Sequence, residues 1–138
     1  MNLNKKNLEE FEKEKSEFIN KCKQVIRGEL KNKNEIDAAD FNGVYIIINE
    51  NNEIVYIGSA YTNKFKIKDR LRIHLNGHIS NTNIVKHIQD DYKIKNKDKA
   101  KQFMKENFRF IACEYESLEY QLMENVPGLY NKKGNIKN

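Results

Sequence analysis

Four side chains between Gly43 and His74 could together act on a phosphate group. Tyr45, Tyr56, Arg70 and His74 supply two phenols, a guanidinium and an imidazole within this one stretch. A guanidinium binds phosphate oxygens through parallel N–H groups, and phenols and imidazoles can transfer protons. These residue types at these intervals therefore favour phosphate chemistry over a purely structural core.

The two tyrosines fall in a predicted β-hairpin. Residues 44–48 and 54–57 are rich in β-branched and aromatic side chains, which is typical of strands. The asparagine-rich residues 49–52 between them suit a tight turn, because asparagine tolerates positive φ. Gly43 and Gly58 flank these strands, and glycine in a strand often marks the close approach of a backbone or a ligand. They weaken the interpretation of both tyrosines as ordinary strand residues.

The hairpin decides which way the tyrosines point. Side chains alternate between the two faces of a strand, so Tyr45 faces away from Val44. If the loop has an even number of residues, Tyr45 and Tyr56 share a face. With Glu50 and Asn51 at the centre of the turn the two tyrosines are expected to lie directly opposite each other, whereas a bulge would separate them.

Arg70 and His74 fall on a predicted helix that begins near Ile67. Ile67, Leu71 and Leu75 recur every four residues and predict a buried stripe. Arg70 and His74 have the same spacing one residue earlier, so both lie together at the edge of that stripe. A solvated basic face is the alternative for such a helix taken alone, but its place directly after the two strands favours a site.

These motifs, taken in order, resemble those of the GIY-YIG nuclease family. The positions that carry the resemblance are Gly43-Val44-Tyr45, Tyr56-Ile57-Gly58, Arg70, His74, Glu119 and Asn131. The resemblance extends over residues 41–131. Two departures are that Val44 replaces the usual isoleucine and that the loop before Arg70 is longer than in many relatives. Because of that longer loop, Arg72 or Lys68 could instead take the arginine role.

The resemblance implies a metal-dependent endonuclease that hydrolyses DNA phosphodiester bonds. Glu119 would hold one divalent ion per active site, Mg²⁺ or Mn²⁺, with water completing the shell. Arg70 would stabilise the charge that develops on the phosphate. Tyr45 would take the proton from the attacking water, and His74 would deprotonate Tyr45, orient it, or act directly as the base.

Two further residues have supporting roles by the same resemblance. Tyr56 would position the phosphate or the water, and Asn131 would brace the site. The alternative function is a nucleic-acid-binding module that retains the fold without cleaving. A structural interaction domain built around the N-terminal helix is a third possibility, and it would lack the salt-dependent DNA affinity of the other two.

The fold expected from the whole chain is α+β. The hairpin and one later strand over residues 108–115 predict a small mixed or antiparallel three-stranded sheet. Flanking helices are expected over residues 81–91, with His87 on the surface, and after Ser117, where Glu119 would lie. An extra N-terminal helix is expected over residues 4–30.

The length of 138 residues indicates one compact unit with extensions. Residues 1–40 are predicted to form the N-terminal helix and a polar linker that starts at Lys31. Residues 41–131 are predicted to form the nuclease domain, and residues 132–138 a flexible tail. The N-terminal helix is expected either to pack on the sheet or to form a homodimer contact.

The basic charge favours a polyanionic partner. The net charge is +5 and the pI is about 9.1, which suits double-stranded or structured DNA, although RNA is not distinguished. The cations predicted to contact phosphates are Lys66, Lys68, Arg72, Lys95, Lys97 and Lys99. A solvated surface is the alternative for the lysine-rich run around residues 93–105.

The composition favours a cytoplasmic protein. The mean hydropathy is −0.86, and no apolar run approaches the ~20 residues that a membrane span requires. The N-terminus lacks the apolar region of a signal peptide. Cys22 and Cys113 lie far apart in the sequence and are expected to be reduced core residues, not a disulfide or a metal site.

Overall fold

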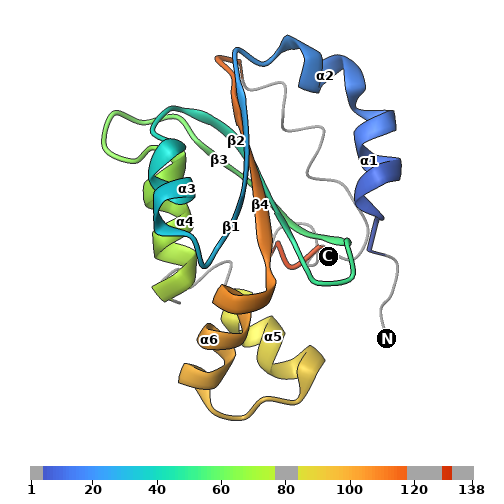
Figure 1. The fold of residues 1–138 in the computed structure, drawn as a ribbon, viewed down its shortest axis with the longest axis vertical. Coiled ribbons are helices and arrows are strands. Elements are labelled where there is room, and N and C mark those ends of the chain that lie inside the picture. Colours follow the sequence, from blue (N-terminus) through green and yellow to red (C-terminus); the bar gives the residue numbers. More distant parts are fainter. Residues whose placement is uncertain (1–4, 77–83, 118–128, 132–138) are drawn as a thin grey trace.

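A four-stranded antiparallel sheet forms the centre of the part of the chain that the structure describes. This structure is a computed structural model, and it describes residues 5–76, 84–117 and 129–131. The strand order is β1-β4-β2-β3 (Figure 1). The strands are β1 Val25–Glu29, β2 Gly43–Ile48, β3 Ile54–Ala60 and β4 Arg109–Glu114. The predicted α+β class, hairpin and later strand are confirmed, but the expected number of three strands is wrong.

The additional strand, β1, comes from the segment expected to be one long helix over residues 4–30. That segment instead forms α1 Leu8–Glu14, α2 Ser16–Lys21 and β1. Val25 and Ile26 are β-branched, and they pair with Cys113 and Ala112 of β4. The gain from joining the sheet along β4 exceeds the helical preference of the amphipathic pattern, so tertiary pairing decides this segment.

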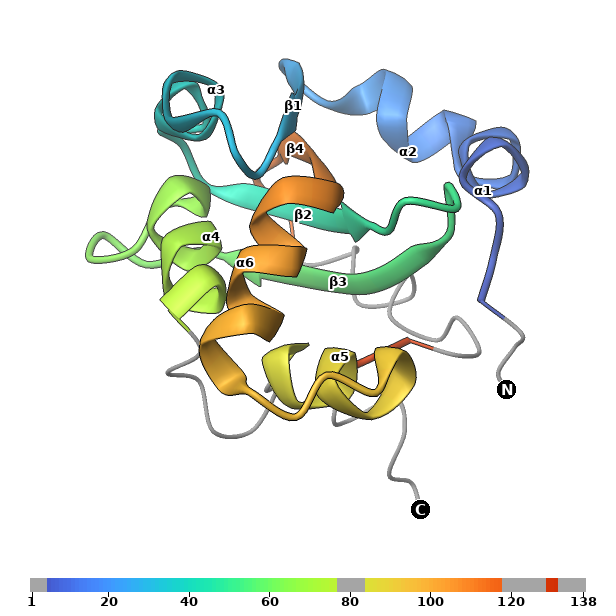
Figure 2. The same ribbon diagram turned by 60° about the horizontal axis from the view of Figure 1, so that its bottom comes forward.

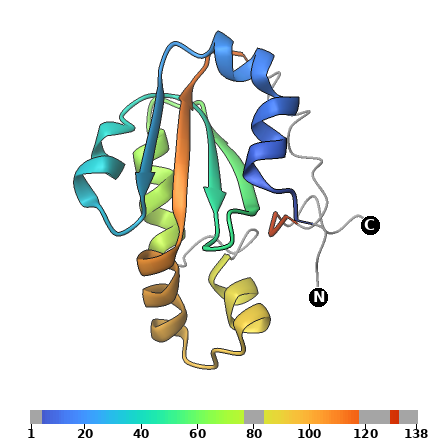
Figure 3. The ribbon, with the colours of Figure 1, turned by 45° about the vertical axis from the view of Figure 1, so that its right-hand side comes forward.

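Six helices in the described residues are divided between the two faces of the sheet (Figures 1 and 3). We call the side covered by α3–α6 the four-helix face and the side covered by α1 and α2 the N-terminal face. The helices of the four-helix face are α3 Lys33–Ala38, α4 Ile67–Asn76, α5 Ile84–Tyr92 and α6 Lys97–Asn107. α5 and α6 pack together at one end of this face (Figure 2).

The helix prediction around residue 67 is confirmed by α4, in which Ile67, Leu71 and His74 are buried. The predicted helix over residues 81–91 is confirmed as α5 from Ile84 onward. The residues expected to form a polar linker contain α3, whose first turn is capped by Asn32. The predicted helix that carries Glu119 and the predicted tail over residues 132–138 lie outside the described residues.

The hairpin places both tyrosines on the four-helix face, but not directly opposite each other. Tyr45 pairs with Gly58, and Tyr56 pairs with Ile47. Ile48 and Ile54 close a loop with an odd number of residues, and the register shift between Ile47 and Ile48 adds a further residue, so the pairing moves by two residues in total and the tyrosines stay on one face. They therefore share a face as predicted, while the expected direct opposition is wrong.

The N-terminal face is closed by α1. Leu8 and Phe11 are buried in one apolar cluster with Val44, Ile46 and Ile57 of the sheet. The apolar side of α1 is thus occupied by its own sheet, so the structure gives no support to the predicted homodimer contact. None of the described helices is both long and apolar enough to cross a bilayer.

Candidate active site

The centre of the site is a hydrogen bond between β2 and α4. The hydroxyl of Tyr45 lies 2.7 Å from Nε2 of His74. Tyr56 completes an aromatic cluster, because its ring centroid is 5.9 Å from that of Tyr45 and 4.6 Å from that of His74. Tyr45 and Tyr56 point from the sheet toward α4, and His74 lies on the buried side of α4. The three rings therefore meet, as the sequence predicts.

Gly58 allows the tyrosine rings to approach β3 this closely. A Cβ atom at this position would lie 2.5 Å from the hydroxyl oxygen of Tyr45 and 2.7 Å from Cε2 of Tyr56. Carbon atoms in proteins do not come this near to such neighbours, so any side chain here would displace both rings. Glycine is therefore required at position 58 because the two tyrosine rings of the site occupy the space of a side chain.

His74 is neutral at physiological pH. His74 is 3% exposed and Tyr45 is 2% exposed. Burial, with the positive charge of Arg70 as a smaller cause, lowers the pKa of His74 to about 3. Its Nδ1 is buried and has no hydrogen-bond partner in the described part of the chain. Nε2 can therefore accept a proton from the Tyr45 hydroxyl in one of the two tautomers.

Arg70 is half-buried beside this pair. Its guanidinium carbon lies 5.3 Å from the centroid of the Phe65 ring, within the range of a cation–π contact. Its Nε is buried without a hydrogen-bond partner among the described residues, and no carboxylate of those residues forms an ion pair with it. An unpaired buried donor on a cation suits an anionic ligand such as a phosphate.

The two alternative cations for the arginine role are already paired. Arg72 forms an ion pair with Asp37 and a second one with Asp69 at 3.7 Å. Lys68 forms an ion pair with Asp40 at 3.3 Å. These carboxylates neutralise both cations locally, so Arg70 is the cation of the three that remains available for a phosphate.

Asn131 braces the strand that carries Tyr56. Its side-chain amide donates to the carbonyl of Ile57 (2.7 Å) and its carbonyl accepts from the Ile57 N–H (3.1 Å). The N–H of Tyr130 also donates to the carbonyl of Val55. Residues 129–131 thus lie along β3, and the buried amide of Asn131 takes the place that a neighbouring strand would have.

A polar cluster around Tyr130, which the sequence analysis did not single out, supports Asn131. The Tyr130 hydroxyl donates to Asp91 (2.5 Å), and Lys5 forms an ion pair with the same carboxylate (3.3 Å). His87, expected on the surface, stacks on the Tyr130 ring with 4.9 Å between centroids. Burial and the bond to Asp91 raise the pKa of Tyr130 well above its ordinary value. In the sequence, the position of Tyr130 directly before the predicted site residue Asn131 could have indicated this cluster.

A divalent ion at this site needs a carboxylate. Within residues 5–76, 84–117 and 129–131, no three His, Cys, Asp or Glu side chains form a metal-binding group. The phenols, the neutral imidazole and the guanidinium are poor ligands for Mg²⁺, which prefers carboxylate oxygens and water. Glu119, the predicted metal ligand, lies outside the described residues. The described groups fit a phosphate, and one carboxylate with water would complete a hard-cation site beside it.

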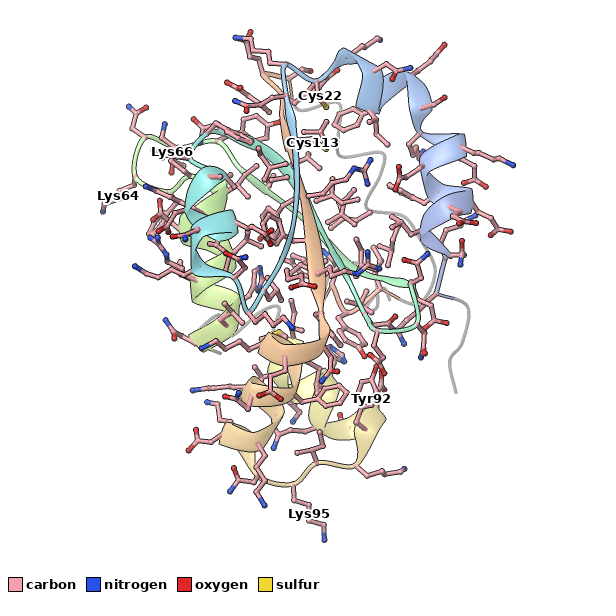
Figure 4. The ribbon with its side chains drawn as sticks, viewed as in Figure 1. Cys22, Lys64, Lys66, Tyr92, Lys95 and Cys113 are labelled. Carbon is pink, nitrogen blue, oxygen red and sulfur yellow. The ribbon has the colours of Figure 1, made fainter. Side chains whose placement is uncertain are left out.

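The remaining predicted phosphate contacts are separated in space. Lys66 is half-buried, and its Nζ lies 3.4 Å from the side-chain oxygen of Asn42. Lys95, Lys97 and Lys99 are exposed near the start of α6. Figure 4 shows Lys66 and Lys95 far apart along the longest axis of the molecule. The predicted basic residues therefore do not form one continuous patch.

Comparison with known proteins identifies the family. Residues 41–126, more than half of the chain, match the family model of the GIY-YIG catalytic domain. Searches of curated proteins and of solved structures gave no match. GIY-YIG domains are nuclease domains that act on DNA and generally use a divalent metal, so the match supports a hydrolase of the nuclease type. The resemblance read from the sequence is confirmed, and the chain belongs to the GIY-YIG family.

Proposed function

We propose that this protein is a metal-dependent endonuclease that hydrolyses phosphodiester bonds in DNA. The observation that carries the proposal is the 2.7 Å hydrogen bond between Tyr45 and a neutral His74, next to Arg70, which has no ion-pair partner among the described residues. A proton acceptor that can pass its proton on, beside a cation suited to a phosphate, is the arrangement that phosphodiester hydrolysis requires.

In this mechanism Tyr45 takes the proton from the attacking water. A phenol ordinarily has a pKa near ~10 and is a poor base at neutral pH unless its own proton is accepted by another group. Nε2 of His74 lies at hydrogen-bonding distance and is unprotonated, so it can receive the Tyr45 proton as the water is deprotonated. Since Nε2 is occupied by Tyr45 and the ring is 3% exposed, His74 acts through Tyr45 and not directly on the water.

Arg70 binds the scissile phosphate and stabilises the negative charge that develops on its oxygens. The guanidinium is held at the edge of the site by Phe65 and is not neutralised by a carboxylate of the described residues. Tyr56 positions the phosphate or the water beside the other two rings. Asn131 keeps the β3 backbone in place next to Tyr56.

Glu119 is the residue that would hold the divalent ion, Mg²⁺ or Mn²⁺, with one ion per active site. When bound, such an ion supplies positive charge at the scissile phosphate and stabilises the leaving oxygen. The substrate we propose is double-stranded or structured DNA. Among the predicted phosphate contacts, the exposed Lys95, Lys97 and Lys99 are better candidates than Lys68 and Arg72, which form ion pairs with carboxylates.

Plasmid cleavage in the presence of Mg²⁺ tests the proposal. The unmodified protein should nick or linearise supercoiled DNA, and Glu119→Ala should abolish cleavage while DNA binding in a gel-shift assay persists. Glu116→Ala is the matched control, because Glu116 is exposed and forms a surface ion pair with Lys23 (2.6 Å) of small energetic value. It should cleave at the normal rate.

Two outcomes would contradict the proposal in different ways. If Glu119→Ala cleaved at the normal rate, Glu119 would not be the metal ligand. If the unmodified protein bound DNA with a salt-dependent affinity but left every substrate intact with Mg²⁺ and with Mn²⁺, the chain would be the non-cleaving binding module.

A further inference from the structure

The two cysteines of the chain meet on the N-terminal face. Cys113 is fully buried on β4, and Cys22 is half-buried directly after α2. Cys113 belongs to the apolar cluster beneath α1 and α2, Cys22 packs against that cluster, and the two side chains lie near each other (Figure 4). Residues far apart in the sequence thus form a dithiol pair outside the active site.

The backbone pairing with β4 is irregular just before β1, next to Cys22. The N–H of Lys23 donates to the carbonyl of Glu114 (3.0 Å), while the N–H of Glu114 donates to the carbonyl of Gln24 (2.9 Å). Two residues of one segment therefore oppose one residue of the other, as in a β-bulge. Cys22 lies directly before this irregular pairing, and Val25, just after it, pairs with Cys113.

The dithiol lies where the N-terminal segment is least firmly held. α2 has no buried residue, in contrast to α1 with Leu8 and Phe11. Phe18 of α2 contacts the ring of Tyr115, which follows β4 (4.5 Å between centroids), and Phe18 and Cys22 pack against the apolar cluster of this face. A covalent bond at this place would fasten α2 to the sheet.

We propose that Cys22 and Cys113 are a redox-active pair that a peroxide oxidises to an intramolecular disulfide. The Cys22 thiolate attacks one oxygen of hydrogen peroxide, the O–O bond breaks, and hydroxide leaves with the electron pair to give a sulfenic acid on Cys22. The sulfur of Cys113 then attacks that sulfur and displaces hydroxide, which takes the Cys113 proton to form water. The two sulfurs together lose two electrons, and the peroxide is reduced to two molecules of water.

The environments of the two thiols support this order of events. The neighbouring thiol of Cys113 lowers the pKa of Cys22, whose own S–H donates to the carbonyl of Phe18 (3.4 Å), whereas the neighbouring Cys22 and burial raise the pKa of Cys113. The thiolate is the reactive form of cysteine. Cys22 is also the more accessible of the two, so it reacts first and Cys113 resolves the intermediate.

Titration of the reduced full-length protein with hydrogen peroxide tests the proposal. We expect a monomer that has lost two hydrogen atoms by mass spectrometry, with no free thiol, and full reversal by dithiothreitol. Because the bond closes a long loop, the melting temperature should rise by about 5–15 °C. Hydrogen exchange of the α2 amides should slow on oxidation.

Cys22→Ser and Cys113→Ala are the controls, and neither should lose two hydrogens or gain thermal stability. Cys22→Ser replaces a half-buried thiol by an isosteric hydroxyl, so this variant stays folded if the buried Cys113→Ala does not. The proposal fails if the unmodified protein accumulates sulfinic acids or intermolecular dimers without the intramolecular disulfide, or if α2 exchange is unchanged. These measurements are independent of DNA cleavage.

Discussion

The two faces of the sheet have the same strands but different contents. β2 alternates between them, so Tyr45 points into the four-helix face while Val44 and Ile46 point into the N-terminal face. The N-terminal cluster contains aliphatic residues, Phe11 and Cys113. The four-helix face buries the hydrogen-bonded pair Tyr45 and His74.

This difference separates stability from chemistry within one sheet. Buried polar atoms without partners, such as Nδ1 of His74 and Nε of Arg70 among the described residues, each cost on the order of 1–3 kcal/mol. Among the described residues, the buried cluster of the N-terminal face contains no such unpaired side-chain nitrogen or oxygen atom. The comparison indicates that the apolar face stabilises the sheet. This stability allows the other face to hold buried polar groups that lack hydrogen-bond partners among the described residues.

Removing the hydroxyl of Tyr45 gives the largest expected effect on the four-helix face. Tyr45→Phe keeps the ring and its packing but removes the proton acceptor, so cleavage should fall by about 10²–10⁴-fold. Tyr92→Phe is the matched control, since the Tyr92 hydroxyl donates to Glu50 in the hairpin turn (3.0 Å). Single-turnover cleavage rates check both variants, and equal rates for the two would remove Tyr45 from the mechanism.

A large apolar truncation on the N-terminal face should affect stability alone. Phe11→Ala removes a fully buried ring and should lower the free energy of unfolding by about 3–5 kcal/mol. Phe18→Ala should cost less, because Phe18 is only partly buried. Urea unfolding measures both. If either variant, while still folded, lost cleavage as Tyr45→Phe does, the separation between the two faces would not hold.

The arginine role distinguishes two neighbours on α4. Arg70→Ala should reduce cleavage by about 10²–10³-fold, because it removes charge stabilisation at the phosphate. Arg72→Ala should leave the cleavage rate unchanged and cost at most about 1 kcal/mol of stability, since its half-exposed ion pair with Asp37 is screened by solvent. Cleavage kinetics and urea unfolding measure the two quantities. The reverse pattern would assign the phosphate contact to Arg72.

The smallest expected effect is a pH dependence that comes from the four-helix face. The pKa of His74 is about 3 in the folded state and near ~6.5 in the unfolded chain. Between these values the unfolded state binds a proton that the folded state does not. Stability is therefore complete above pH ~6.5 and falls by up to about 1.4 kcal/mol per unit as the pH decreases toward 3.

Urea unfolding at a series of pH values from 7 to 5 checks this dependence against His74→Gln, which lacks the contribution. His87→Gln is the control for a histidine whose pKa is lowered by burial but raised by the nearby Asp91 and Asp90. It should retain most of the dependence of the unmodified protein. Parallel curves for the unmodified protein and His74→Gln would show that His74 is not held neutral.

The sequence by itself determined the local relations within the site. Strand alternation placed Tyr45 and Tyr56 on one face, and the four-residue spacing placed Arg70 and His74 on one edge of α4. The motif order also identified the family. These features depend on the period of a strand or a helix, which follows from neighbouring residues, and so they are readable without knowledge of distant contacts. The division of the chain at residue 41 stays a prediction.

Only the tertiary structure decided the relations between distant segments. Val25–Glu29, predicted to be helical, forms β1 because its backbone pairs with that of β4. The tertiary structure left Arg70 as the available cation because Asp37 and Asp40 neutralised Arg72 and Lys68. It placed Asn131 beside β3, and Cys22 against the apolar cluster that contains Cys113. Such partners are chosen by how complete elements pack, and no local pattern of residues encodes that choice.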